Sequence, residues 1–311
     1  GTGRTLNILG DVKIGNTYNV AETGGVVHGA VTTNFTGGGN FYMNGTNFWV
    51  GTGNGTTNNG FQTQVDMSAL ANFTAILGTG GVFAVDYNGD NVSSVLQKFV
   101  MAGTSNVIQT GTLTVGGSGQ SNNHLMNLGA GTNTLYATTV NLGTGGRAGG
   151  TLQFNSAAGT LVLRDATGIG RVALNMGNNT NNTGTTSSAN LLLAGHNVDV
   201  LFGAINMYGQ ARAGASANTI TFDQGIFDAY SITMAGRTSG SAFDNAITVV
   251  GGVFNVGLGG VNLGSSNNGP QTGRITISGG VATINGNVTQ GGGGGLRGLT
   301  VSGGTLDMAG N

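Results

Sequence analysis

The sharpest chemical motif in the sequence is a run of oxygen-bearing residues within DYNGDNVSS, residues 86–94. Asp86, Asn88 and Asp90 offer oxygen ligands at alternating positions, as the opening of a calcium-binding loop does. The glutamate that closes such a loop is absent, because Gln97 stands where it would be expected. A tight turn rich in Asx residues is therefore the favoured interpretation, with calcium as the alternative and no other cofactor expected.

Aspartates at related positions raise the question of glycoside cleavage, which needs two carboxylates facing one groove. Asp199, Asp228 and Asp307 fall at comparable places in successive stretches of the chain, but each adjoins an apolar position and is expected to face solvent. The 3 histidines are too far apart in sequence to suggest a metal site. We therefore expect no catalytic residues, and we do not expect an enzyme.

Arginines recur in the variable loops between the repeats described below. In a repetitive fold, this spacing would align them along one edge. Such a basic loop edge would suit an anionic glycan or a neighbouring fibre, although simple solubility of the loops is the favoured alternative. These residues are Arg147, Arg212, Arg237, Arg274 and Arg297.

The composition limits how these side chains can be positioned. Of 311 residues, 63 are glycine and 7% are charged, with one proline and no cysteine. A formal net charge of −1 gives no reason to expect nucleic acid as a partner, and the apolar runs are too short to insert in a membrane. Short runs of Val, Ile, Leu, Phe and Thr, separated by Gly, Asn and Ser, predict many short strands joined by turns.

An internal repeat explains most of the chain. An apolar-Thr-apolar triplet followed by glycine occurs in GRITISGG (273–280) and again in RGLTVSGG (297–304). If the last apolar residue of each triplet is used as a marker, successive markers are separated by 27, 26, 39, 29, 27, 28 and 24 residues. Each period then reads as a strand, a glycine turn, two short strands and a variable loop. The markers are Met101, Leu128, Phe154, Leu193, Phe222, Val249, Ile277 and Val301.

The triplets also predict which side chains face inward. Residues two apart share a face of a strand, so Ile275 and Ile277 point one way and Thr276 points the other. One unit cannot bury its apolar face alone, whereas stacked copies bury it continuously. The sequence therefore predicts an all-β fold, a right-handed parallel β-solenoid (β-helix) of roughly 11 coils, about 27 residues per coil, without clear capping elements.

We expect one solenoid domain over residues 1–311. The register of the repeat is clear for residues 95–311 and blurred for residues 1–94. Within the blurred part, the stretch 65–77 is expected to be either a further coil or a short helical excursion.

Three phrases of the repeat resemble a known family. LTVSGGTLDM (299–308), ITISGGVATI (275–284) and NTITFDQGIF (218–227) are similar to the autotransporter-associated β-strand repeat of large bacterial surface proteins. The likeness covers about residues 95–311. It implies an exported β-solenoid that serves as a stalk, an adhesin or a matrix component, and it carries no catalytic or binding residues over to this sequence.

The two ends of the chain stop at nearly the same phase of the repeat. Ile8 and Met308 both align with Ile284 when the end segments are compared with ATINGNVTQG (282–291). Neither end resembles a polar cap, so we expect exposed strand edges that join copies head to tail, a contact that generates filaments. The residues expected at this joint are Leu6, Ile8, Val12, Leu306, Met308 and Gly310.

The expected function is that of a structural subunit in an extracellular filament, surface fibre or matrix. The expected partners are copies of the same chain, with surface glycans as a further candidate. A β-helix that binds or cleaves carbohydrate is the alternative function. That alternative would need clustered aromatic rings, whereas Trp49 is the single tryptophan and the tyrosines do not recur in register.

Overall fold

The structure, a computed structural model, describes residues 3–15, 27–52, 60–87, 96–117, 124–145, 149–177, 188–208, 216–234, 243–264, 271–291 and 296–309. All regular secondary structure in these residues is β-strand, which confirms the all-β class. Among the same residues, no helix long and apolar enough to cross a membrane is present.

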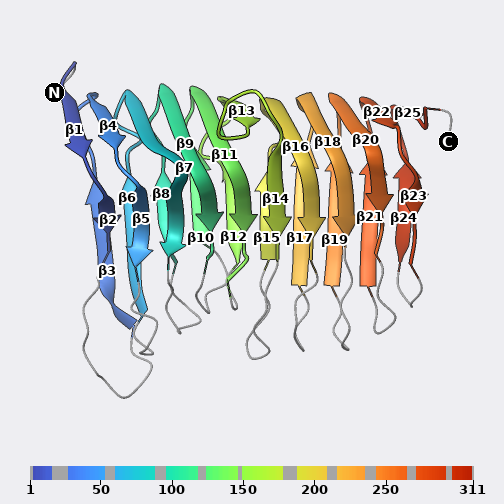
Figure 1. The fold of residues 1–311 in the computed structure, drawn as a ribbon, viewed down its shortest axis with the longest axis horizontal. Helices are drawn as coiled ribbons and strands as arrows, with labels where there is room; N and C mark the ends of the chain where they lie inside the picture. Colours follow the sequence, from blue (N-terminus) through green and yellow to red (C-terminus); the bar gives the residue numbers. More distant parts are fainter. Residues whose placement is uncertain are drawn as a thin grey trace.

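Neighbouring strands run parallel and form two sheets that extend along the axis of a rod (Figure 1). The expected parallel β-solenoid is confirmed. The smaller sheet has 10 strands, slightly fewer than the roughly 11 coils expected. In order along the axis they are β3 (Val27–Asn34), β6 (Gly60–Asp66), β8 (Lys98–Val100), β10 (His124–Leu128), β12 (Gly150–Phe154), β15 (Ser188–Leu192), β17 (Ser216–Phe222), β19 (Phe243–Val249), β21 (Gln271–Ile277) and β24 (Arg297–Val301).

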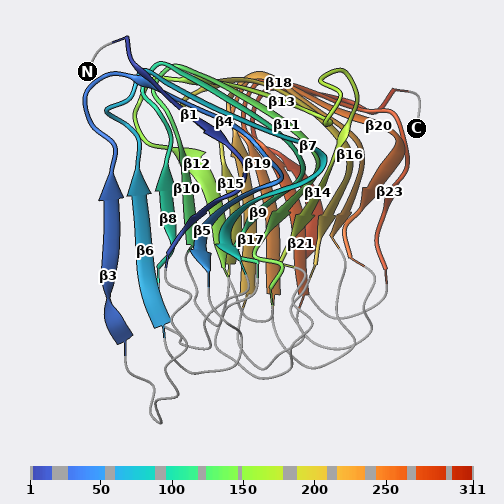
Figure 2. The ribbon, with the colours of Figure 1, turned by 60° about the vertical axis from the view of Figure 1, so that its left-hand side comes forward.

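The larger sheet has 15 strands and is bent (Figure 2). We call the part of each coil before the bend its first limb and the part after the bend its second limb. Where two short strands were expected, most coils have one long strand that continues through the bend: β7 (Asn72–Tyr87), β9 (Ser105–Val115), β11 (Thr132–Leu142), β16 (Asn197–Met207), β18 (Gln224–Met234) and β20 (Val253–Asn262). Separate first-limb strands are β1 (Thr5–Leu9), β4 (Asn40–Asn44), β13 (Thr160–Arg164), β22 (Val281–Ile284) and β25 (Thr305–Asp307). Separate second-limb strands are β2 (Val12–Ile14), β5 (Asn47–Thr52), β14 (Val172–Met176) and β23 (Val288–Thr289).

Inward side chains form columns that run along the rod, as the marker residues predict. Ile277 pairs with Val249 on one side and with Val301 on the other. Ile277 and Val249 are fully buried, while Thr248 and Thr276 beside them face outward and stay partly exposed. Burying one such aliphatic side chain contributes about 1.5–3 kcal/mol, so the stacked columns are the main source of stability.

In the C-terminal coils a glycine turn links β19, β21 and β24 to the next first limb. Gly252, Gly280 and Gly304 hold positive φ angles of 74°, 74° and 71° in successive coils. A Cβ at Gly280 would lie 2.4 Å from the carbonyl oxygen of Gly252. The repeated glycine is therefore required both by backbone conformation and by the close stacking of the turns.

The N-terminal part has the same architecture, although its register is blurred in the sequence. The stretch 65–77 belongs to a further coil and is not a helical excursion, because β6 ends at Asp66 and β7 begins at Asn72 after a turn. Phe48 lies at the centre of a cluster of buried rings here, within 6.3 Å of four other ring centroids. These aromatic side chains fill the interior that aliphatic residues fill in the C-terminal coils.

Candidate functional site

The N-terminal end of the rod exposes three strand edges. Within the described residues β1 pairs with β4, β2 with β5 and β3 with β6, and their outer edges carry no further strand. Leu6 is 49% exposed, Ile8 and Phe35 are half-buried, and Val12 is buried. Apolar side chains that belong to the interior columns are thus uncovered at this end.

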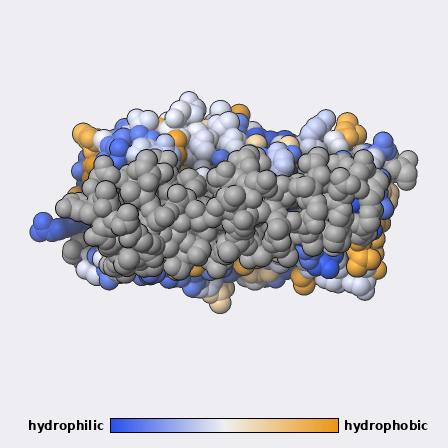
Figure 3. All heavy atoms as spheres, turned by 90° about the horizontal axis from the view of Figure 1, so that it is seen from below, coloured by the Kyte–Doolittle hydropathy of each residue, from blue (hydrophilic) through white to orange (hydrophobic). Residues whose placement is uncertain are grey.

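The C-terminal end is open in the same way. The outer edges of β23, β24 and β25 carry no further strand within the described residues. Val301 is 45% exposed, whereas Ile277 and Val249 in the same column are fully buried. Leu306 and Met308 are half-buried, and Gly310 lies outside the described residues. Hydrophobic surface is visible at both ends of the rod (Figure 3).

The strand ladder corrects the predicted alignment of the two ends by two residues. Followed coil by coil, the inward column that starts at Ile8 ends at Leu306, through Ala282, and not at Met308. The reason lies in the bend, because Ile8 and Val12 are four positions apart in the first coil, whereas Ala282 and Val288, which continue their columns, are six positions apart. The inward column that starts at Val12 ends at Val288, in agreement with the alignment of the first strands with residues 282–291.

The N-terminal end of the rod is hollowed. A hollow of about 300 Å³ lies there between the start of β1 and the turn after β3, lined by Arg4, Leu6, Phe35, Phe41 and Leu70 among others. A second hollow, of about 250 Å³, lies on the outer face of the smaller sheet beside Arg274 and Thr300 of β21 and β24. Sequence reasoning missed Phe35 and Leu70, because both belong to the part with the blurred register.

Asp86, the first residue of the predicted calcium motif, lies in the interior. It is 1% exposed, and its φ of 73° is unusual for a residue other than glycine. Its Oδ2 atom lies 3.2 Å from Nε2 of His124, which is buried as well. Asn88 and Asp90 lie outside the described residues, so the calcium prediction stays a prediction.

His124 is held as a neutral ring by its surroundings. Its Nδ1 accepts a hydrogen bond from the backbone N–H of Gln97 at 3.2 Å, so the ring proton belongs on Nε2, facing Asp86. Burial lowers the pKa of His124, and attraction to Asp86 opposes this only in part. Protonation would place two N–H groups against each other in the interior.

The buried His124 ring predicts a loss of stability in mild acid. Between its lowered pKa and the usual value near 6.5, the unfolded chain binds more protons, so the free energy of unfolding falls as the pH falls. We expect a lower urea midpoint at about pH 5 than at about pH 7.5 and a smaller difference in His124→Gln. Asp11 and Asp165, whose pKa values are lowered chiefly by hydrogen bonds from Asn47 and Thr167, act only in stronger acid. An equal pH effect in both proteins would contradict this assignment.

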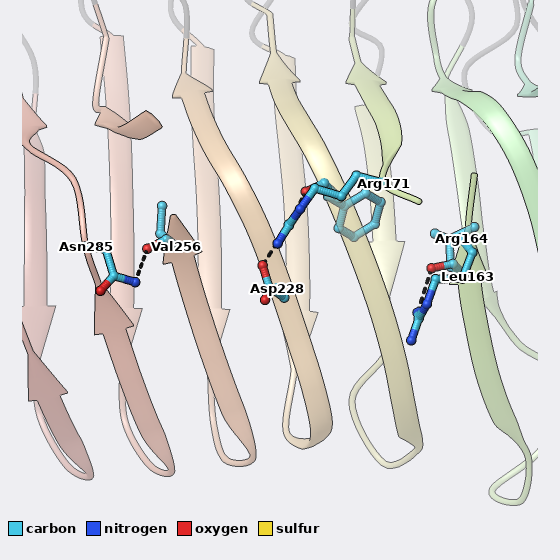
Figure 4. Close-up of polar contacts among 7 residues, drawn as sticks. Leu163, Arg164, Arg171, Asp228, Val256 and Asn285 are labelled. Carbon is cyan, nitrogen blue, oxygen red and sulfur yellow. Dashed lines mark hydrogen bonds and ion pairs between the residues drawn. The ribbon is translucent and has the colours of Figure 1, made fainter. Parts of the chain in front are cut away.

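The aspartates considered for catalysis are held by neighbouring groups. Asp199 forms an ion pair of 2.5 Å with Arg164. Asp228 forms one of 2.8 Å with Arg171 on the outer face of the larger sheet (Figure 4). Asp307 accepts a hydrogen bond from the backbone N–H of Ala309. Asp199 and Asp228 lie on adjacent strands, but each carboxylate is directed to its own arginine, an arrangement suited to bracing neighbouring coils.

The predicted basic loop edge is described at two of its residues, and both lie in strands and not in the variable loops where they were expected. Arg274 lies within β21 and pairs with Asp244 at 2.7 Å. Arg297 begins β24 and donates a hydrogen bond to the carbonyl oxygen of Gly291. Both bind groups of this chain. The other three arginines, Arg147, Arg212 and Arg237, lie outside the described residues.

Trp49 is covered on both faces of its ring. Lys13 on β2 lies 4.2 Å above the ring centroid. The ring of Tyr87 stacks at 4.0 Å, and β5, which carries Trp49, lies between β2 and β7. A sugar ring would have to displace one of these side chains to stack on the tryptophan.

Comparison of the whole chain with models of protein families, with curated proteins and with solved structures found no match. The geometry of the chain itself is therefore the basis for a functional conclusion. Within the described residues, the terminal strands uncover side chains of columns that are mostly buried further along the rod.

Proposed function

We propose that this chain is a structural β-solenoid whose copies join head to tail through the two open ends. The observation that carries the proposal is the interruption of the interior columns at both ends, with Leu6 and Val301 left about half exposed. Covering these side chains with the opposite end of another copy would continue both the columns and the sheets. The two ends differ, so the contact does not close on itself and extends into a filament.

The setting that we propose is the cell surface or the extracellular space. The support is the resemblance of phrases such as LTVSGGTLDM (299–308) to the repeats of bacterial surface proteins, together with the low content of charged residues. In that setting the rod would act as a subunit of a fibre, stalk or matrix. Its faces, with ion pairs between neighbouring coils, are suited to a load-bearing role.

The proposal predicts that the purified 311-residue chain associates end to end. Sedimentation velocity and negative-stain microscopy at increasing concentration should show rods that lengthen in multiples of one unit. Val301→Lys should reduce the association at least tenfold, because it places a charge in the contact that the interior column would make. Ile169→Lys is the matched control, since Ile169 is 84% exposed between β13 and β14, in the middle of the rod.

Single rods at every concentration would overturn the proposal. Equal loss of association in Val301→Lys and in Ile169→Lys would also contradict it, because association would then not run through the ends. The fold of each variant is checked by circular dichroism, so that a failure to fold is not mistaken for a failure to associate.

A further inference from the structure

A patch of exposed apolar side chains lies on the outer face of the larger sheet. In the first limbs of three successive coils, the ladders align Ile226 with Val253 and Val253 with Val281. These three side chains are 46%, 38% and 46% exposed. Tyr230 and Leu258, at the bend of the same sheet, are 50% and 77% exposed. Apolar side chains that gather on one face in this way are typical of an interaction site.

The ring of Tyr230 lies on a floor of glycine. The register of β18 and β20 shifts at this point, so that Tyr230 faces three residues, Gly257 to Gly259. A Cβ at Gly257 would lie 3.2 Å from Cδ2 of the ring, and a Cβ at Gly259 would lie 3.0 Å from Cε1. Cδ2 and Cε1 belong to opposite sides of the ring, so the ring rests flat across this segment. Larger residues at the two glycines would push it away.

The other face of the Tyr230 ring is open. Gly203 of β16 stands beside Tyr230 on the opposite side of β18, and it has no side chain that could cover the ring. Trp49 differs, because Lys13 and Tyr87 cover both faces of its ring. Tyr230 is the most exposed aromatic side chain among the described residues. Its ring is therefore presented to solvent as a flat surface.

Hydrogen-bonding side chains lie beside the ring. Asp228, two residues before Tyr230 on the same face of β18, pairs through its Oδ1 atom with Arg171 at 2.8 Å (Figure 4). The ladders align Asp228 with Asn255 and Asn255 with Thr283, so a carboxylate, an amide and a hydroxyl form a row along the rod. Neighbouring members of the row are about 4.8 Å apart, which is close to the length of one sugar residue in an extended chain.

The size and the charge of the patch decide which ligand fits it. It extends about 13 Å along the strand from Ile226 to Tyr230 and about 10 Å along the rod from β18 to β22. Even with the width of the side chains added, this area is well below the ~800 Å² that each partner buries in a stable protein–protein interface. The row of polar side chains continues from Thr283 to Asp307. Because carboxylates stand at both Asp228 and Asp307, an acidic ligand would be repelled.

We propose that this face is a glycan-binding platform for neutral β-linked glucan chains, formed by Asp228, Tyr230, Asn255 and Leu258. The hydroxyl groups of such a chain are equatorial, so each sugar ring has an apolar C–H face and a polar rim. One ring stacks its C–H face on Tyr230 with Asp228 at its rim. The next ring lies over Leu258 with Asn255 at its rim. The platform lies within one chain and does not depend on head-to-tail association.

Isothermal titration calorimetry of the 311-residue chain with cellohexaose tests the platform. Tyr230→Ala should weaken binding at least about fivefold, because it removes the stacking surface, whereas Tyr230→Phe keeps the ring and should bind as the unmodified chain does. Leu258→Glu should also weaken binding, because it places a charge beside the ring without altering Tyr230. The matched control is Tyr87→Ala, since Tyr87 belongs to the same sheet but stacks on Trp49 at 4.0 Å.

Loss of binding in Tyr230→Ala and Leu258→Glu, with binding kept in Tyr230→Phe and Tyr87→Ala, would support the platform. Unchanged binding in Tyr230→Ala or an equal loss in Tyr87→Ala would overturn it, and so would tighter binding of hexagalacturonate, an acidic chain of the same length. No binding of cellohexaose by the unmodified chain would overturn it as well. Rods that lie side by side in microscopy and are separated by Val253→Lys would then show a contact between copies in its place. Circular dichroism checks the fold of each variant.

Discussion

Phe48→Ala is expected to lower the free energy of unfolding of the N-terminal coils by about 3–5 kcal/mol, among the largest effects of any single substitution in this protein. Phe48 is fully buried, and its ring centroid lies 4.7 Å from that of Phe83 and 5.4 Å from that of Phe99. Truncation removes these contacts and leaves a cavity that strands fixed by their ladders cannot collapse. Urea unfolding followed by circular dichroism measures the loss.

The effect of Phe48→Ala should stay local along the rod. In a solenoid each coil contacts its neighbours, so stability is roughly a sum over coils and interfaces. Hydrogen exchange should therefore speed up in β4 to β9 and change little in β17 to β24. Phe48→Leu, which keeps most of the volume, should cost less than about 1.5 kcal/mol. A loss below about 1 kcal/mol in Phe48→Ala would show that the ring cluster does not hold these coils together.

Much of the C-terminal fold could be predicted from sequence because its coils repeat with little change in length. Val249, Ile277 and Val301 stand at the same place in successive triplets, and the ladders put them in one column. Since equivalent residues of successive coils stack on one another in a parallel solenoid, a constant period determines which side chains of each strand face inward. A change in the length of the bend shifts this correspondence. Four positions separate Ile8 from Val12 but six separate Ala282 from Val288, which is why the alignment through Ile284 placed Met308 rather than Leu306 in line with Ile8.

The N-terminal register could not be read in the same way. Thr5 pairs with Asn40 and Asn40 pairs with Asn72, so these spacings differ from those further along the chain. The position of Asp86 also had no signal in the sequence, because a positive φ turns a residue that resembles a calcium ligand into the interior. Local geometry of this kind depends on the packed neighbours, among them His124, and not on the spacing of residue types.

The interior amides were also missed, although their spacing carries a signal. Asn106 and Asn133 lie one coil apart, and so do Asn218 and Asn245. All four are buried, and within each pair one amide donates to the next at 2.9 Å or 2.8 Å. An asparagine that returns at the period of an inward column therefore indicates an internal ladder, whereas asparagine in this sequence is otherwise typical of turns.

Asn133→Leu is expected to cost about 3 kcal/mol or more, because it removes the most connected amide of these ladders. The Oδ1 atom of Asn133 accepts hydrogen bonds from Nδ2 of Asn106 and from the backbone N–H of Gly129, each at 2.9 Å. Its Nδ2 atom donates to the carbonyl oxygens of Gly129, Gly131 and Thr160. Leucine has a similar size but satisfies none of these groups.

The control for this substitution lies on the same strand. Asn141 is half-buried on the outer face of β11, and its Oδ1 accepts a hydrogen bond from Asn175 at 3.0 Å. Water can replace that bond, so Asn141→Leu should cost less than about 1 kcal/mol by urea unfolding. Similar losses of unfolding free energy in both variants would mean that burial does not determine how much the amide ladder stabilises the coil. A much larger loss for Asn133→Leu would show that unsatisfied interior groups, rather than lost amide contacts as such, determine the stability of the coil.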